Sequence, residues 1–141
     1  MITIIKNIEN PFMEYIKDDP VRPEISKDFR VSKHRFVCVL GEETPSAIVC
    51  VSLLNHVPVT VEELEADEEE TTAVFYTIWS YVPGAARKLL FETINFIHEQ
   101  FPSVNRFVTL SPKTELAKRF HLRNGAILLK DNETTVNYEY I

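Results

Sequence analysis

Cysteine is scarce in this chain, and its placement argues against two kinds of site. The sequence has 141 residues and two cysteines, Cys38 and Cys50. They do not form a C-x-x-C pair and no histidine cluster accompanies them, so we expect neither a metal site nor a disulfide framework. Both lie in apolar runs, which predicts buried free thiols and suits a reducing, cytoplasmic setting.

Long apolar runs and an excess of positive charge are also missing. No run reaches the ~18 consecutive apolar residues of a membrane-spanning helix, and the N-terminus has no charged-then-apolar signal pattern. Lys and Arg number 15 against 21 Asp and Glu, which gives a formal net charge of -6. We therefore expect no membrane and no nucleic acid as partner, because nucleic-acid binding usually needs a basic surface. A small anionic ligand remains compatible, since a few local groups dominate the potential of a pocket.

What the sequence does contain is typical of one folded domain, residues 1–141. Its hydrophobic content is 45%, and a chain of this length can bury a substantial core. Periodic apolar spacing predicts helices at 83–102 and 112–125, and Asn10 with Pro11 predicts the start of a short helix. Runs of β-branched and aromatic residues predict strands at 1–8, 35–42, 46–54, 71–82, 105–111, 126–132 and 134–141.

The order of these elements predicts an α+β fold. Antiparallel hairpins lead into one strand–helix–strand crossover, which must make strands 71–82 and 105–111 parallel. We expect a mixed sheet of about six to seven strands, mostly antiparallel with this one parallel pair, flanked by helices. Segment 18–34 is expected to be irregular or a broken helix, and the acidic segment 59–70 a short helix and a solvated loop.

The turn after the central strand has the composition of an anion site. "VPGAARK" (82–88) places Gly84 and two alanines where backbone amides can approach a ligand, and the helix N-terminus adds a partial positive charge. Arg87 and Lys88 lie in the first helical turn, where they oppose the helix dipole unless an anion binds. The alternative is a tight strand–helix connection with two exposed cations, and a single glycine does not decide between them.

This turn and the order of elements together resemble the Gcn5-related N-acetyltransferase (GNAT) fold. In that family the loop after the fourth strand follows the pattern Q/R-x-x-G-x-G/A and holds the pyrophosphate of coenzyme A. "YVPGAA" (81–86) has the glycine and the final small residue, with Tyr81 in place of Gln or Arg. The resemblance implies a CoA thioester as substrate, no metal, and a parallel strand pair that splays at the CoA site. The cofactor-binding residues that it implies are Trp79, Ser80, Tyr81, Val82, Pro83, Gly84, Ala85, Ala86, Arg87 and Lys88.

Several blocks are similar, in the same order, to the catalytic domain of malonyl-CoA decarboxylases. The similarity spans about residues 35–141 and implies conversion of malonyl-CoA to acetyl-CoA and CO2. The Ser and His of that family correspond to Ser111 and His121, and Tyr138 is a further candidate for the acyl pocket. The blocks are "TAVFYTI" (72–78), "PG" (83–84), "RFVTLSP" (106–112), "FHLRNGAIL" (120–128) and "VNYEY" (136–140).

The same catalytic candidates also have structural explanations. Ser111 before Pro112 fits a helix N-cap followed by proline at the first helical position, and His121 fits a packed imidazole. If the helix began at Pro112, its rise alone would separate Ser111 from His121 by about 15 Å. We therefore expect two walls of an acyl pocket and no hydrogen-bonded pair. Ser111 is expected to hold the carboxylate or polarise the carbonyl, and His121 to donate a proton.

Three functions are open at this point. The first is a malonyl-CoA decarboxylase-like enzyme. The second is an N-acetyltransferase that moves acetyl from acetyl-CoA to a small amine or protein acceptor. There Tyr138 or Tyr140 is the candidate general acid, and the acidic stretch 62–70 attracts a cationic acceptor. The third is a non-catalytic acyl-CoA-binding module. A homodimer is compatible with each.

Overall fold

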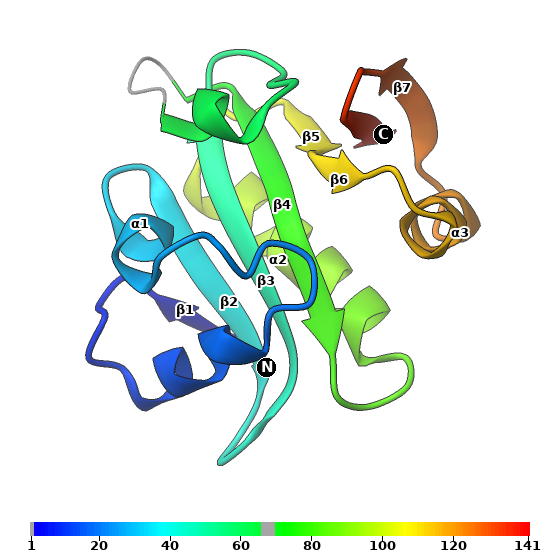
Figure 1. Cartoon of the computed structure of the whole chain (residues 1–141). Helices are drawn as coiled ribbons and strands as arrows, with labels where there is room; N and C mark the ends of the chain where they lie inside the picture. Colours follow the sequence, from blue (N-terminus) through cyan, green and yellow to red (C-terminus); the bar gives the residue numbers. More distant parts are fainter. Residues whose placement is uncertain (1, 66–69) are drawn as a thin grey trace.

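The computed structural model describes residues 2–65 and 70–141, and its core is one mixed sheet of eight strands (Figure 1). The strand order is β1-β2-β3-β4-β5-β8-β6, with β7 paired to β8, and β4–β5 is the parallel pair in an otherwise antiparallel sheet. The predicted α+β fold is confirmed. The strands are β1 (Ile2–Ile5), β2 (Arg35–Gly41), β3 (Pro45–Leu54), β4 (Thr72–Ser80), β5 (Arg106–Thr109), β6 (Ser111–Pro112), β7 (Ile127–Asp131) and β8 (Thr135–Tyr140).

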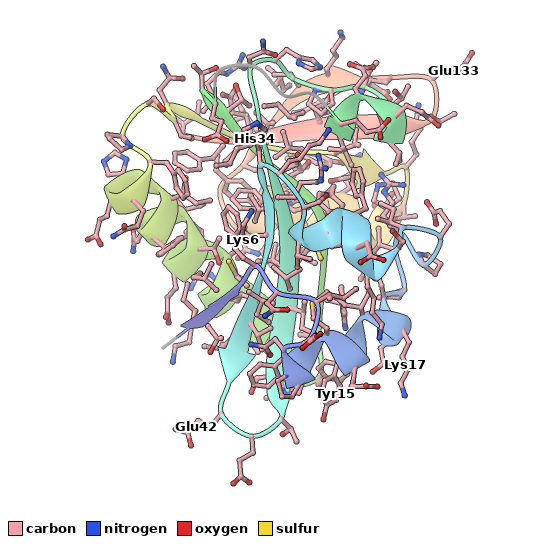
Figure 2. All side chains as sticks on the ribbon, turned by 90° about the vertical axis from the view of Figure 1, so that its left-hand side faces the viewer. Lys6, Tyr15, Lys17, His34, Glu42 and Glu133 are labelled. Atoms are coloured by element: carbon pink, nitrogen blue, oxygen red, sulfur yellow. The ribbon has the colours of Figure 1, made fainter. Side chains whose placement is uncertain are left out.

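Helices cover both faces of the sheet. The long helix α2 lies on one face, while η1 and α1 lie on the other, and Figure 2 shows this three-layer arrangement with the sheet nearly edge-on. No helix in 2–65 or 70–141 is long and apolar enough to cross a bilayer. The helices are η1 (Pro11–Asp18), α1 (Lys27–Val31), η2 (Val61–Glu65), α2 (Ala85–Gln100) and α3 (Glu115–Arg123), of which η1 and η2 are 3-10 helices.

The N-terminal helices are short because the sequence caps and interrupts them. Asn10 caps η1 by accepting a hydrogen bond from the Phe12 amide at 2.9 Å, and proline follows it as predicted. Proline at positions 20 and 23 keeps the chain out of a helix until Ser26 caps the five-residue α1. The prediction of a broken helix within 18–34 is therefore confirmed. Residues 66–69 of the acidic segment lie outside the described part of the chain.

The core has two layers, one on each face of the sheet. Leu89, Leu90 and Ile97 of α2 are fully buried against one face. Met13 and Ile16 of η1 are buried against the other. Full burial of an aliphatic side chain of this size stabilises a fold by about 1.5–3 kcal/mol, so both layers contribute to holding the sheet in place.

The segment between η1 and α1 crosses the sheet in front of β3 and β4 (Figure 1), and a buried carboxylate fastens it there. Asp19 Oδ2 accepts from Arg30 Nη1 at 2.6 Å, and its Oδ1 accepts from Thr77 Oγ1 at 2.9 Å. Oδ1 also accepts from the amides of Val21 and Arg22. Asp19 therefore joins the N-terminal segment to the middle of β4.

Candidate functional site

The candidate site begins where the two parallel strands separate. β4 and β5 are paired only from Thr72–Arg106 to Phe75–Thr109, and the Leu110 amide makes one more bond to the Phe75 carbonyl at 3.0 Å. The chain then turns away, and β6 pairs with β8 instead. The second half of β4 is left with one free edge. The predicted strand 105–111 is thus two strands, and the parallel pair is splayed.

A cleft of about 670 Å³ fills the space between this half of β4 and α3, a volume typical of small-molecule sites. One wall is the β4 stretch 75–80, and the opposite wall is α3 with the residues before it. Pro20 and Val21 of the N-terminal segment complete the lining. The lining runs from Leu110 and Ser111, where the strands separate, to the turn at Gly84.

Ser111 lies at the end where β4 and β5 separate, and 4% of it is exposed. Its Oγ donates to Thr109 Oγ1 at 2.7 Å, and the same Thr109 oxygen accepts from the Tyr138 amide at 3.0 Å. The N-cap interpretation of Ser111 is wrong: it belongs to β6, and Thr114 caps α3 by accepting from the Ala117 amide at 3.2 Å. The backbone at Ser111 stays extended because it pairs with Val136 of β8.

His121 projects from α3 into the same cleft and is nearly buried, with 4% exposed. Its Nδ1 lies 2.6 Å from Tyr140 Oη, and its ring stacks on Tyr138 with centroids 5.2 Å apart. Burial lowers the pKa of His121 to about 4, so the imidazole is neutral at pH 7. The role of His121 as a proton donor, expected from the sequence, stays a prediction.

The Tyr140 hydroxyl determines which His121 nitrogen carries the proton. Burial raises the pKa of Tyr140, so its hydroxyl keeps its hydrogen. If Oη–H donates to Nδ1, the neutral ring carries its hydrogen on Nε2. In the reverse arrangement Nδ1–H donates to Oη, which leaves both the Tyr140 hydroxyl hydrogen and the Nε2 lone pair without a partner among the described residues. The first arrangement leaves one such group, the Nε2–H, and is therefore more favourable. The Nε2–H is therefore the His121 donor available to a ligand.

Tyr138 was the tyrosine that the sequence placed in the acyl pocket, but it packs against the His121 ring and is not part of the cleft lining. Sequence reasoning did not connect Tyr140 with His121, because the two are 19 residues apart and meet only when β8 docks beside α3. Ser111 and His121 both line the cleft. Their bonds within the described structure go to Thr109 and Tyr140, not to each other.

The opposite end of the cleft is positively charged. Gly84 has φ 81° and caps α2 without a side-chain hydrogen bond. Arg87 Nε donates to Asn124 Oδ1 at 2.9 Å, which ties the start of α2 to the end of α3. Arg119 and Arg123 also line the cleft. No Asp or Glu of the described residues does.

Sequence reasoning named Arg87 but missed the two α3 arginines. Their spacing of four places both on one face of a helix, which was the available signal. The same reasoning expected no metal. Within 2–65 and 70–141 no group of three His, Cys, Asp or Glu side chains could hold one.

The ten residues expected to bind the cofactor divide into two sets. Trp79, Ser80, Gly84, Ala86 and Arg87 line the cleft, while Tyr81, Val82, Pro83, Ala85 and Lys88 do not.

Tyr81 is turned away by its own hydrogen bonds. Its Oη donates to Asp18 Oδ2 at 2.8 Å and accepts from Trp79 Nε1 at 3.1 Å. Ala85, the first residue of α2, is buried, and Lys88 is exposed.

Comparison with known proteins gives matches at the level of structure. No protein-family model and no curated protein matches the sequence. Malonyl-CoA decarboxylase from Rhodopseudomonas palustris superposes with a TM-score of 0.78 at 19% identity, over 99% of this chain and 59% of that one. The Agrobacterium vitis decarboxylase gives 0.70 at 22%, over 85% and 35%.

The chain therefore spans little more than half of one decarboxylase and about a third of the other. Arabidopsis thaliana NAA60 in complex with acetyl-CoA gives a TM-score of 0.63 at 12% identity, over 99% of this chain and 98% of that one. At these identities the likeness concerns the fold. The splayed β4–β5 pair and the strand order agree with it, and this chain has a GNAT-like fold.

Proposed function

We propose that this protein binds an acyl-CoA in the β4–α3 cleft and converts malonyl-CoA to acetyl-CoA and CO2. The observation that carries the proposal is the composition of the cleft lining. Three arginines and Gly84, the N-cap of α2, line the cleft. A buried neutral imidazole and a serine hydroxyl line it as well. The first set suits phosphates, and the second suits a thioester.

The charged end fits the phosphates of CoA. Amides at the α2 N-terminus attract an anion, and Arg87, Arg119 and Arg123 add three positive charges around it. The free edge of β4 then offers backbone amides and carbonyls to the amide groups of the pantetheine arm, as in strand addition. This orientation brings the thioester towards Ser111 and His121.

Decarboxylation requires that the thioester carbonyl accept the electrons of the broken C–C bond. We assign the His121 Nε2–H to this oxygen, because a neutral imidazole can stabilise a developing enolate by hydrogen bonding. Thr109 can donate to Ser111 Oγ in place of the bond it now accepts, which frees the Ser111 hydroxyl to orient the acyl group. Loss of CO2 leaves the thioester enolate, whose α-carbon takes one proton from solvent water and so yields acetyl-CoA. The thioester is the electron sink, so this route needs no additional cofactor.

The first test is turnover of malonyl-CoA, followed by mass spectrometry of acetyl-CoA. We expect His121→Ala to lower kcat by about 100-fold, the typical effect of losing one donor at a developing oxyanion. Ser111→Ala should also lower kcat, because the acyl group is then less well oriented. His98→Ala, an exposed histidine of α2, is the matched control and should keep full activity.

Turnover that survives the Ser111→Ala, His121→Ala double change would contradict the assigned mechanism. If neither acetyl-CoA nor malonyl-CoA raises the Tm at 100 times a micromolar Kd, where about 2.7 kcal/mol of stabilisation is expected, the CoA proposal fails altogether.

An N-acetyltransferase is the second candidate, and one observation favours it. NAA60 in complex with acetyl-CoA corresponds to this chain over 98% of its length, against 59% for the R. palustris decarboxylase. The described lining holds no Asp or Glu to serve as its general base. Acetyl transfer to a panel of amines, without CO2 release from malonyl-CoA, would favour this candidate. Binding without either reaction would favour a non-catalytic acyl-CoA module.

A further inference from the structure

Two aromatic side chains connect the first turn of α2 with the His121 imidazole. Arg87 and Phe91 stand at positions i and i+4 of α2, on one face of the helix, and the Arg87 guanidinium carbon lies 5.3 Å from the centre of the Phe91 ring. The Phe91 ring meets Tyr140 edge-on, with centroids 6.0 Å apart and an interplanar angle of 90°. The Tyr140 hydroxyl in turn lies 2.6 Å from His121 Nδ1.

A second connection joins the same two places through the end of α3. Arg87 Nε donates to Asn124 Oδ1 at 2.9 Å. Asn124 caps α3, and its amide donates to the carbonyls of Phe120 and His121 at 3.2 Å each. The turn of α3 that carries His121 is thus fixed to the start of α2. Together the two connections form a closed cycle of contacts that includes α2, α3 and β8.

The five members of this cycle differ in exposure. Tyr140 and His121 are buried, and Phe91 and Asn124 are half-buried. Arg87 is exposed and lines the cleft, so it is the member that a bound anion meets. Its bond to Asn124 is exposed to water and therefore weak by itself, whereas a phosphate that accepts two parallel hydrogen bonds fixes a guanidinium in one place. Anion binding thus orders the exposed member of the cycle.

The position of the Tyr140 hydroxyl depends on what packs against its ring. Rotation of the ring about its side-chain bonds moves the hydroxyl away from His121, and close packing by Phe91 restricts this rotation. We propose that Phe91 is a positioning residue through which an anion at Arg87 fixes the Tyr140 hydroxyl on His121 Nδ1. Phe91 and Tyr140 are absent from the cleft lining, so both act on a ligand only through His121.

This inference rests on the proposed acyl-CoA function and adds a control of its reaction by the phosphates of the substrate. The Nε2–H of His121 stabilises an enolate only while the imidazole holds its hydrogen on that nitrogen and points it at the thioester oxygen. The Tyr140 hydroxyl on Nδ1 secures this arrangement. The phosphates of CoA therefore contribute to kcat as well as to binding, although they take no part in the chemistry.

The test separates the phosphates of CoA from its acyl group. The probe is 3′-phospho-ADP, which carries these phosphates and has no pantetheine arm. At saturation we expect it to move the Nδ1 resonance of His121 upfield in the nitrogen NMR spectrum of the wild-type protein, the direction of a stronger accepted hydrogen bond. The spectrum of His121→Asn, which lacks this resonance, assigns it. We also expect 3′-phospho-ADP to raise the kcat for malonyl-pantetheine, a substrate without phosphates, by several-fold.

Three variants assign the response to the Phe91 ring. Phe91→Leu removes the ring and should bind 3′-phospho-ADP nearly as well as the wild type, but lose most of the Nδ1 shift and the rise in kcat. Phe91→Tyr keeps the ring and should keep both. Phe96→Leu is the matched control, because Phe96 is a half-buried phenylalanine of α2 that contacts Phe36 and Phe101. It should respond as the wild type does.

The outcomes separate this inference from the acyl-CoA proposal. Binding of 3′-phospho-ADP without a change at His121 refutes the inference and leaves the CoA site in place, while failure to bind refutes both. A response at His121 in a protein that does not turn over malonyl-CoA contradicts the decarboxylase and leaves the role of Phe91 standing.

Two further results would overturn the role of Phe91. One is a full Nδ1 shift in Phe91→Leu, and the other is an equal loss of the shift in Phe96→Leu. If Phe91→Leu does not fold, Phe91→Met takes its place, because methionine fills irregular apolar space without an aromatic ring. A full shift in Phe91→Met would then refute the inference.

Discussion

At the scale of single residues, His121 combines burial, a tyrosine partner and access to the cleft. A histidine whose pKa is lowered to about 4 stays neutral in the folded protein over a range where the unfolded chain, with a pKa near 6.5, gains a proton. Stability is therefore fully present above pH 6.5 and falls as the pH drops towards 4. The same burial that fixes the neutral donor makes the fold sensitive to acid.

We predict that the free energy of unfolding falls by about 3 kcal/mol between pH 7 and pH 4 because of His121 alone. Denaturant titrations at each pH measure this. The reference is the double variant His121→Phe, Tyr140→Phe, which removes both hydrogen-bonding partners and so leaves neither unsatisfied. Carboxylates titrate alike in both proteins and cancel in the difference. Parallel pH profiles for the two proteins would refute the prediction.

At the scale of elements, the turn from β4 into α2 depends on one glycine. Gly84 adopts φ 81° at the helix N-cap, and a Cβ placed there meets nothing within 4 Å. The requirement is therefore backbone conformation and not close packing. The direction in which the first turn of α2 leaves β4 depends on this conformation.

We predict that Gly84→Ala lowers the free energy of unfolding by about 1 kcal/mol, the usual cost of an L-residue in the left-handed region. Gly125→Ala is the matched control, since Gly125 has φ 97°, equally open surroundings and no place in the cleft lining. Both changes should cost similar stability in thermal unfolding. Binding of S-propyl-CoA should weaken by several-fold in Gly84→Ala and remain unchanged in Gly125→Ala. Equal affinities would argue against phosphate binding at α2.

At the scale of the whole molecule, the Asp19–Arg30 pair connects the N-terminal segment to the sheet. Asp19 accepts a hydrogen bond from Thr77 of β4. Arg30, a residue of α1, donates to the loop carbonyls of residues 22 and 25. The wall formed by Pro20 and Val21 depends on this connection. Loss of one partner leaves an uncompensated buried charge.

We predict that Arg30→Met destabilises the protein by about 3–5 kcal/mol. Asp19→Asn combined with Arg30→Met should cost less than the sum of the two single changes. The double variant removes both members of the ion pair, so neither charge is left buried without its partner. Arg123→Met, an exposed arginine of α3, is the control and should lie within about 0.5 kcal/mol of the wild type. Additive costs in the double variant would show that the two residues act independently.

Much of the fold was predictable because its signals are local. The run 71–82 is apolar on both faces and became the central strand β4, while the periodic segment 83–102 became α2. The start of α3 was misplaced because two capping residues, Ser111 and Thr114, both precede the helix. Pairing of Ser111 with β8, far along the chain, selected the second. Local capping rules cannot register that competition.

The candidate site was predictable in part, and what was missed involves distant contacts. By itself the sequence determined the order of the elements along the chain, the single parallel crossover and the glycine turn, because each follows from local pattern or spacing. Ser111 and His121 were nominated by the resemblance to malonyl-CoA decarboxylases. Only the tertiary structure decided that Tyr140 orients His121, that two arginines of α3 join Arg87, and that Arg22 lies beside Leu110. These contacts join segments 19 to 88 residues apart, or depend on which helix face meets the cleft. The physical reason is that burial and charge pairing depend on what surrounds a side chain, and packing supplies those surroundings.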